Sequence, residues 1–102
     1  MKTKSQALFE KLSYTKAPTE GYLDPFGNFI YSRKPGSDKL IDQMVFNHET
    51  GKLTPAVKAG MVKNETDYRD YRKSFEKLNL KPSPETDNFS KRVLDAHRKY
   101  FT

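Results

Sequence analysis

The sequence contains no cysteine and only two histidines, His48 and His97. Without cysteine the chain can form no disulfide, no reactive thiolate and no cysteine-bound zinc site. Neither histidine has a second ligand three or four residues away, so a metal site would have to be assembled entirely by the tertiary fold. The sequence therefore predicts neither a metal site nor a bound cofactor.

Motifs of the common catalytic sites are also absent. The chain has no Gly-x-Ser-x-Gly nucleophile elbow, and its five glycines match neither the phosphate-binding loop nor the dinucleotide-binding fingerprint. Gly51 and Lys52 are followed by Leu53 rather than by the hydroxyl residue that a phosphate-binding loop requires. On these grounds we expect a protein without enzymatic activity.

Long hydrophobic runs are missing as well. No stretch approaches the roughly 18 apolar residues of a membrane-spanning helix. The N-terminus is basic, as in a signal peptide, but Glu10 and Lys11 interrupt its apolar run. We expect no membrane span and no secretion, and a protein that stays in the cytoplasm or within a particle assembled there.

Large apolar side chains are scarce. Leu, Ile, Val and Phe account for 21 of the 102 residues, just above the roughly 20% below which disorder is expected. This amount suffices for one small core but not for two. We therefore predict a single, lightly packed domain over residues 1–102, with extended segments, that gains stability from a partner.

Charge of both signs is abundant, with 19 Lys and Arg against 13 Asp and Glu and a net charge of +6 at pH 7. The positive excess is dispersed along the chain rather than concentrated in one segment. Such a charge favours association with nucleic acid or with an acidic protein surface, but it supplies no local phosphate-binding stripe by itself.

Aromatic residues gather in one segment, Tyr22–Tyr31. Within it, Asp24–Gly27 has the residue preferences of a type I turn, with Asp first, Pro second and Gly fourth. This turn would fold the start of the segment back onto its end. Phe29 and Tyr31 would then share one face of a short strand, with Ile30 on the other.

A β-hairpin is predicted after the aromatic segment. Leu40–Asn47 is the strand candidate, Gly51 lies where a hairpin loop needs a glycine, and Leu53 can begin the return strand. Pro55 restricts that return strand to an edge or cuts it short. Ala56–Lys63 is expected to be flexible, because its glycine disfavours a long helix.

Helices are predicted on both sides of this region. Thr3–Tyr14 has the spacing of a capping box and a short apolar face. Asn64–Leu78 has a capping Asn, acidic residues in its first turn, and one apolar face formed by Tyr68, Tyr71, Phe75 and Leu78.

A last helix follows Ser83 and Pro84, which suit a cap and a first-turn proline. Its apolar face would consist of Phe89, Val93, Ala96 and Tyr100. Because only about five residues join it to the preceding helix, we expect the two to form a helical hairpin.

The predicted fold class is a small α+β protein. A short N-terminal helix and connector would occupy residues 1–21, the aromatic turn and β-hairpin residues 22–63, and the C-terminal helical hairpin residues 64–102.

The aromatic segment admits two interpretations. Its rings can form the core of the domain itself, or they can anchor the protein in a partner, because aromatic side chains dominate interface energetics. The candidate anchors are Tyr22, Phe26, Phe29 and Tyr31. They predict protein–protein interaction by a structural or accessory subunit of a larger assembly, such as a virion or another multi-subunit particle.

Two alternatives remain. The first is nucleic-acid binding through basic side chains near aromatic rings, for which the candidates are Arg33, Lys34, Lys91, Arg92, Arg98 and Lys99. Asp95 interrupts this basic face, and no recognition-helix or ribonucleoprotein motif accompanies it. The second alternative is a small protein that inhibits a partner enzyme.

Overall fold

The computed structural model describes residue 4 and residues 17–60, 63–80 and 88–101. In chain order the described elements are β1 (Glu20–Leu23), β2 (Asn28–Ser32), the 3-10 helix η1 (Leu40–Asp42), β3 (Gln43–Asn47), β4 (Leu53–Pro55), α2 (Ala56–Ala59), α3 (Glu65–Lys73), β5 (Glu76–Asn79) and α4 (Asn88–Tyr100). The N-terminal helix expected over Thr3–Tyr14 lies, apart from Lys4, outside the described residues, as do Ser83 and Pro84.

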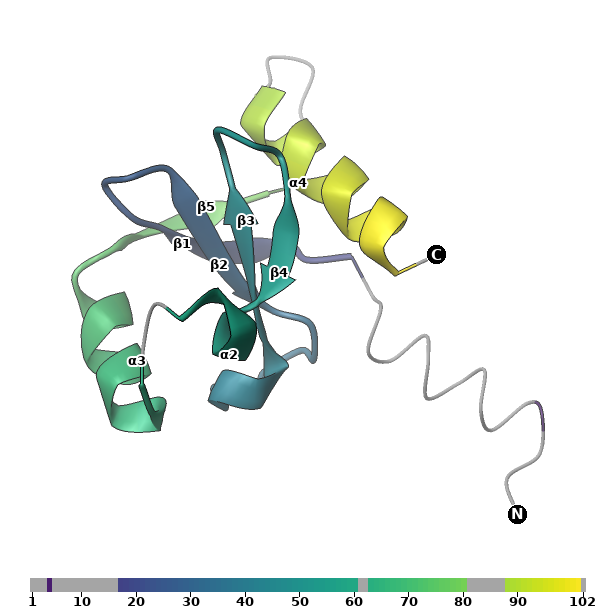
Figure 1. Cartoon of the computed structure of the whole chain (residues 1–102). Coiled ribbons are helices and arrows are strands. Elements are labelled where there is room, and N and C mark those ends of the chain that lie inside the picture. Colours follow the sequence, from purple (N-terminus) through teal and green to yellow (C-terminus); the bar gives the residue numbers. More distant parts are fainter. Residues whose placement is uncertain (1–3, 5–16, 61–62, 81–87, 102) are drawn as a thin grey trace.

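The five described strands form one antiparallel sheet in the order β4-β3-β2-β1-β5 (Figure 1). The first four strands form a meander, in which each strand pairs with the one before it. β5 follows α3 in the chain and pairs with the other side of β1, with Leu78 opposite Gly21. The sheet therefore joins the aromatic segment to a part of the chain about 50 residues later, a long-range pairing that local signals do not reveal.

The predicted turn at Asp24–Gly27 is confirmed. The amide of Gly27 donates to the carbonyl of Asp24 at 3.2 Å, and Gly27 has a φ of 84°, which favours glycine. The turn sets Leu23 opposite Phe29 in the β1–β2 pair. The aromatic segment thus forms a hairpin at the centre of the sheet.

The second predicted hairpin is confirmed in its loop and corrected in its first strand. Gly51, with a φ of 70°, lies in the β3–β4 loop, and β4 begins at Leu53 and ends at Pro55 on an edge of the sheet. Leu40–Asp42, however, is a 3-10 helix rather than strand. The amide of Arg33, the residue after β2, donates to the carbonyl of Asp42 at 2.8 Å and so holds the end of η1 beside the end of β2.

Side chains alternate between the two faces of the sheet. One face packs against α4, and the buried cluster on that side consists of Phe29, Tyr31, Met44, Phe46, Leu53, Leu80 and Val93. The other face packs against α2, η1 and α3, and the buried cluster on that side consists of Ile30, Leu40, Val45, Ala56 and Tyr68. The expected placement of Phe29 and Tyr31 on one face and Ile30 on the other is confirmed, because the side-chain period of a strand is two.

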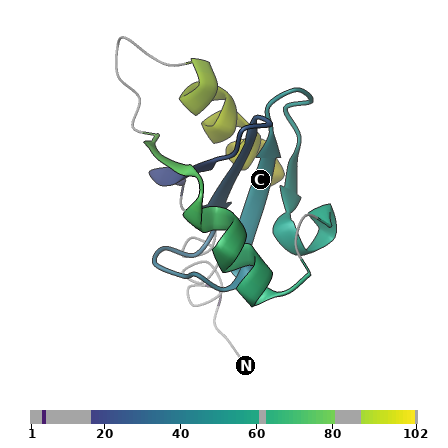
Figure 2. The same cartoon turned by 90° about the vertical axis from the view of Figure 1, so that its left-hand side faces the viewer.

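The two long helices lie on opposite faces of the sheet, so the predicted helical hairpin is wrong. Figure 2 shows α3 in front of the strands and α4 beyond them. The helix predicted over Asn64–Leu78 ends at Lys73, and Glu76–Asn79 forms β5 instead. Pairing with β1 decides this, since it gives that side of β1 its hydrogen-bond partners and lets the following Leu80 enter the core.

The predicted helix start at Asn64 is confirmed, because its side chain accepts a hydrogen bond from the amide of Asp67 at 2.9 Å. Similarly, α2 (Ala56–Ala59) ends at Gly60, which has a φ of 69°, so within residues 56–60 the helix is a single turn.

The apolar face of α4 is partly as predicted. Val93 is buried, and Phe89 and Ala96 pack against the same core. Tyr100, however, is 46% exposed, and Phe101 packs there in its place. With both faces covered, the sheet is the middle layer of a compact fold, in place of the lightly packed, extended chain expected from composition.

Candidate functional site

The four candidate anchors differ sharply in burial. Phe29 and Tyr31 are 0% and 1% exposed, so for these two rings the structure supports the core interpretation. Tyr22 is half-buried, with the guanidinium of Arg72 at 5.0 Å from the centre of its ring. Phe26, by contrast, is 78% exposed at the tip of the β1–β2 turn. It is the one candidate whose ring faces solvent.

The turn that carries Phe26 is held by the buried carboxylate of Asp24. One carboxylate oxygen accepts from the amides of Phe26 at 2.9 Å and Asn28 at 2.8 Å. The other accepts from the side-chain amide of Asn28 at 3.0 Å and from the hydroxyl of Tyr71 at 2.6 Å. Since Tyr71 belongs to α3, these bonds connect the turn to the helix layer and fix its conformation.

These hydrogen bonds also set the pKa of Asp24. Burial by itself raises the pKa of this carboxyl, but the bonds from Tyr71, Asn28 and Phe26 favour the charged form, and the net effect lowers the pKa. The pKa of the Tyr71 hydroxyl is raised, first by burial and then by its bond to the Asp24 carboxylate. The pair therefore holds its proton on the tyrosine.

The β3–β4 loop and α4 meet beside this turn. The amide of His48 donates to the carbonyl of Gly27 at 3.1 Å. The guanidinium of Arg92 donates to the carbonyl of His48 at 2.7 Å and lies 2.9 Å from its Nδ1. The structure thus brings a predicted aromatic anchor, Phe26, and a predicted basic residue, Arg92, to the same end of the sheet.

The four basic candidates on α4 share its outer face. Lys91, Arg92, Arg98 and Lys99 are all exposed, together with Asp95, opposite the buried Val93 and His97. Arg92 bends back onto the protein, where it contacts His48 and lies 5.7 Å from the ring of Phe46. The predicted basic surface therefore exists, with Asp95 inside it.

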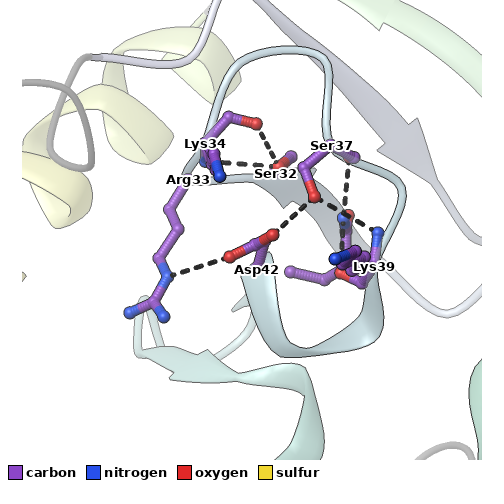
Figure 3. A network of polar contacts seen from close by, with 7 residues as sticks. Ser32, Arg33, Lys34, Ser37, Lys39 and Asp42 are labelled. Atoms are coloured by element: carbon purple, nitrogen blue, oxygen red, sulfur yellow. Dashed lines mark hydrogen bonds and ion pairs between the residues drawn. The ribbon is translucent and has the colours of Figure 1, made fainter.

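The other two basic candidates, Arg33 and Lys34, belong to the loop between β2 and η1 (Figure 3). Nε of Arg33 lies 3.9 Å from a carboxylate oxygen of Asp42. The carbonyl of Lys34 accepts from the hydroxyl of Ser32 at 2.6 Å, and its amide donates back to that hydroxyl at 3.2 Å. These two bonds between the hydroxyl of Ser32 and the backbone of Lys34 shape the start of the loop.

Three exposed apolar side chains were not among the sequence candidates. Ile41 in η1 is 63% exposed, Val57 in α2 is 50% exposed, and Tyr100 in α4 is 46% exposed. η1 and α2 contact each other at the end of the sheet opposite the Phe26 turn. Local sequence gave no signal for them, because their exposure depends on how the short helices pack.

The two histidines have structural partners. His97 is 3% exposed, and its Nδ1 is hydrogen-bonded to the hydroxyl of Tyr31. Burial raises the pKa of that hydroxyl, which keeps it protonated. Within residues 17–60, 63–80 and 88–101, no group of three or more acidic or histidine side chains could hold a metal ion.

A groove of about 340 Å³ opens on the α3 side of the sheet. Its walls include the start of β1 with Tyr22, residues 35–38 of the β2–η1 loop, and Arg72 of α3. Sequence reasoning missed it entirely, since these segments become neighbours only through the sheet.

Comparison with known proteins adds no assignment. No protein-family model, curated protein or solved structure matches the chain. In the part of the chain that the structure describes, no helix is both long enough and apolar enough to cross a membrane.

Proposed function

We propose that this protein is a non-enzymatic accessory or structural subunit that attaches to a larger protein assembly through Phe26. One observation carries the proposal: a phenylalanine side chain is 78% exposed at the tip of a turn that four hydrogen bonds hold in place. Large apolar side chains near the centre of interfaces supply much of the binding free energy.

The rigidity of the turn supports this function. Ordering a loop on binding costs conformational entropy, and a preformed turn avoids most of that cost. The bonds to Asp24 use backbone amides and the side chains of Asn28 and Tyr71, and none uses the ring of Phe26. The ring is therefore available for a pocket on the partner.

The subunit proposed here differs in one respect from the expectation based on composition. A chain poor in apolar residues was expected to gain its order from a partner. The buried clusters on both faces of the sheet support instead a subunit that is folded before it binds.

The test is size-exclusion chromatography of native extracts from the source. The wild-type protein should elute within a large assembly, and Phe26→Ser should elute as a free monomer. Ile41→Ser is the matched control, because it removes another exposed apolar side chain, 63% exposed, at the opposite end of the sheet. Thermal melts of the purified variants should match that of the wild type.

Two outcomes would refute the proposal. Elution of Phe26→Ser together with the assembly would show that this ring is not the anchor. Elution of the wild type as a monomer would show that the protein does not belong to a larger assembly.

Nucleic-acid binding is the second candidate function, favoured by the four basic side chains on the outer face of α4. If the contact is made to phosphates, affinity for a random-sequence oligonucleotide should fall steeply with salt. Arg98→Glu should weaken binding, whereas Lys73→Glu, on the opposite side of the sheet, should have a much smaller effect. An affinity independent of salt would exclude this function.

A further inference from the structure

The groove on the α3 side of the sheet has an unusual cation. The guanidinium of Arg72 lies between two tyrosine rings, 5.0 Å from the centre of Tyr22 and 5.4 Å from that of Tyr68. No acidic side chain of residues 17–60, 63–80 and 88–101 forms an ion pair with it. Arg72 is only half-exposed, so a charge with reduced hydration faces the groove with no carboxylate partner among the described residues.

The acidic side chains along the groove have cationic neighbours of their own. Glu20 lies 3.2 Å from Nζ of Lys77, and Asp38 lies 3.9 Å from the guanidinium of Arg69, which Glu65 also approaches at 3.8 Å. Among the described residues that line the groove, Arg72 is the one cationic side chain. It is therefore the group that a negative charge on a ligand would contact.

The wall of the groove that the β2–η1 loop forms is held by hydrogen bonds. The side-chain amide of Gln43 donates to the carbonyls of Ser37 and Lys39, both at 3.1 Å, and accepts from the hydroxyl of Tyr68 at 2.6 Å. The hydroxyl of Ser37 donates to Asp42, as Figure 3 shows. Because the loop is ordered without a ligand, binding need not fix it.

We propose that this groove binds a small carboxylate, with Arg72 as its partner and the ring of Tyr22 as a flat wall for the rest of the ligand. The planar guanidinium matches a carboxylate in a two-bond geometry. A doubly charged phosphate fits less well, because Glu20 and Asp38 also line the groove. A volume of about 340 Å³ equals that of roughly ten waters, which suits one or two amino-acid residues.

The site is independent of Phe26, which does not line the groove. Its test is an NMR titration of the full chain with N-acetyl-phenylalanine, using the uncharged N-acetyl-phenylalanine amide as the matched probe. The carboxylate should shift the amide resonances of Tyr22, Gly36 and Ser37 and saturate in the millimolar range. Equal shifts with the amide, or shifts outside the groove, would overturn the proposal.

Two peptides separate the possible sources of the carboxylate. One is a tetrapeptide with a free C-terminus, and the other is an amidated tetrapeptide with an internal Glu. Tighter binding of the first identifies a terminal carboxylate, and tighter binding of the second identifies an acidic side chain. If neither peptide binds while N-acetyl-phenylalanine does, the ligand is a free small acid.

Two substitutions test whether Arg72 is the group that binds the carboxylate. Arg72→Gln should lower the affinity for the carboxylate about tenfold or more, because it removes a charge-assisted hydrogen bond. Lys73→Gln removes the same charge one residue away, from a side chain that is 78% exposed, and should leave the affinity unchanged. Equal effects of the two variants would show that binding depends only on the net charge of the protein, and would contradict the proposal.

Asp38→Asn provides a test that loss of folding cannot imitate. It removes a negative charge from the groove wall while Arg72 stays in place. The carboxylate should then bind about two- to fivefold more tightly. Unchanged or weaker binding to this variant would also overturn the proposal.

Discussion

Asp24 shows how one buried carboxylate can organise a surface feature. Its oxygens accept bonds from its own turn and from Tyr71 in α3, so it joins a local loop to a distant helix. Its pKa is lowered because these bonds outweigh the opposing effect of burial. A group with a depressed folded-state pKa contributes stability above its unfolded pKa, and this contribution disappears as the pH falls.

Asp24→Asn should therefore destabilise the protein at pH 7 by about 1 to 3 kcal/mol, the cost of unpairing buried hydrogen-bond partners. Below about pH 4, where the carboxylate of the unfolded wild type is protonated, the difference between the two proteins should shrink. Urea denaturation at pH 7 and at pH 3 measures both effects. Asp70→Asn, at a side chain that is 68% exposed, is the control and should change stability little at either pH.

Gly21 is required for a close approach between β1 and the core. A Cβ at this position would overlap the ring of Phe29 and lie 2.7 Å from the carbonyl oxygen of Ile30. Both neighbours are buried in the centre of the sheet, so neither can move away.

We expect Gly21→Ala to destabilise the fold by about 2 kcal/mol or more, the cost of overpacking a core. Gly36→Ala is the comparison, because a Cβ there would meet nothing within 4 Å and only its φ of 78° opposes the change. Its cost should be about 1 to 2 kcal/mol. A smaller loss for Gly21→Ala than for Gly36→Ala in urea denaturation would contradict this account of the packing.

At the scale of elements, a buried hydrogen bond from α3 helps to hold the β2–η1 loop. The hydroxyl of Tyr68 donates to the buried amide oxygen of Gln43, whose nitrogen in turn holds the loop carbonyls. The helix therefore orients the amide, and the amide orients the loop.

Tyr68→Phe should cost about 1 to 3 kcal/mol, because it leaves the buried oxygen of Gln43 without this donor. The loop amides of Ser37 and Lys39 should also exchange their hydrogens faster than in the wild type. Tyr100→Phe, which removes a hydroxyl from a side chain that is 46% exposed, should change neither quantity. Unchanged loop exchange in Tyr68→Phe would show that the loop is held by its other contacts.

Local elements were predicted well where neighbouring residues decide them. The turn at Asp24–Gly27, the loop glycine Gly51 and the cap at Asn64 each depend on bonds within a few residues. Phe75 and Leu78 continued the helical spacing of Tyr68 and were therefore assigned to the same helix. Pairing with β1 overrode that spacing, because β5 supplies hydrogen-bond partners along the whole of β1, from Glu20 to Leu23.

At the scale of the whole molecule, the buried clusters on the two faces of the sheet take side chains from the same strands. Phe29 and Tyr31 belong to one cluster and Ile30, between them, to the other. Neither side of the core can lose its packing without disturbing the same strand. The described residues should therefore unfold as one unit.

The isolated chain is accordingly predicted to melt in a single cooperative transition. Near-UV and far-UV circular dichroism should give the same midpoint, and the calorimetric and van't Hoff enthalpies should agree. Two separate transitions would indicate that α3 and α4 pack independently. A melt without cooperativity would restore the expectation that order is gained from a partner.

The candidate sites could be predicted only in part. Phe26 and the basic side chains of α4, which were candidates from the sequence, are exposed, whereas Phe29 and Tyr31, which were candidates of the same kind as Phe26, are core residues. Residue type does not distinguish these roles, because an aromatic side chain stabilises a core or an interface by the same burial of apolar area.

By itself the sequence determined the local features: the two tight hairpin loops, the start of α3, and the alternation of side chains in β2. These follow from backbone conformations and from bonds between near neighbours. The tertiary structure alone decided that β5 pairs with β1, that α3 and α4 lie on opposite faces, and that Arg72 meets Tyr22 in a groove. Each of these depends on contacts between residues far apart in the chain, whose free energy exists only once the sheet has formed.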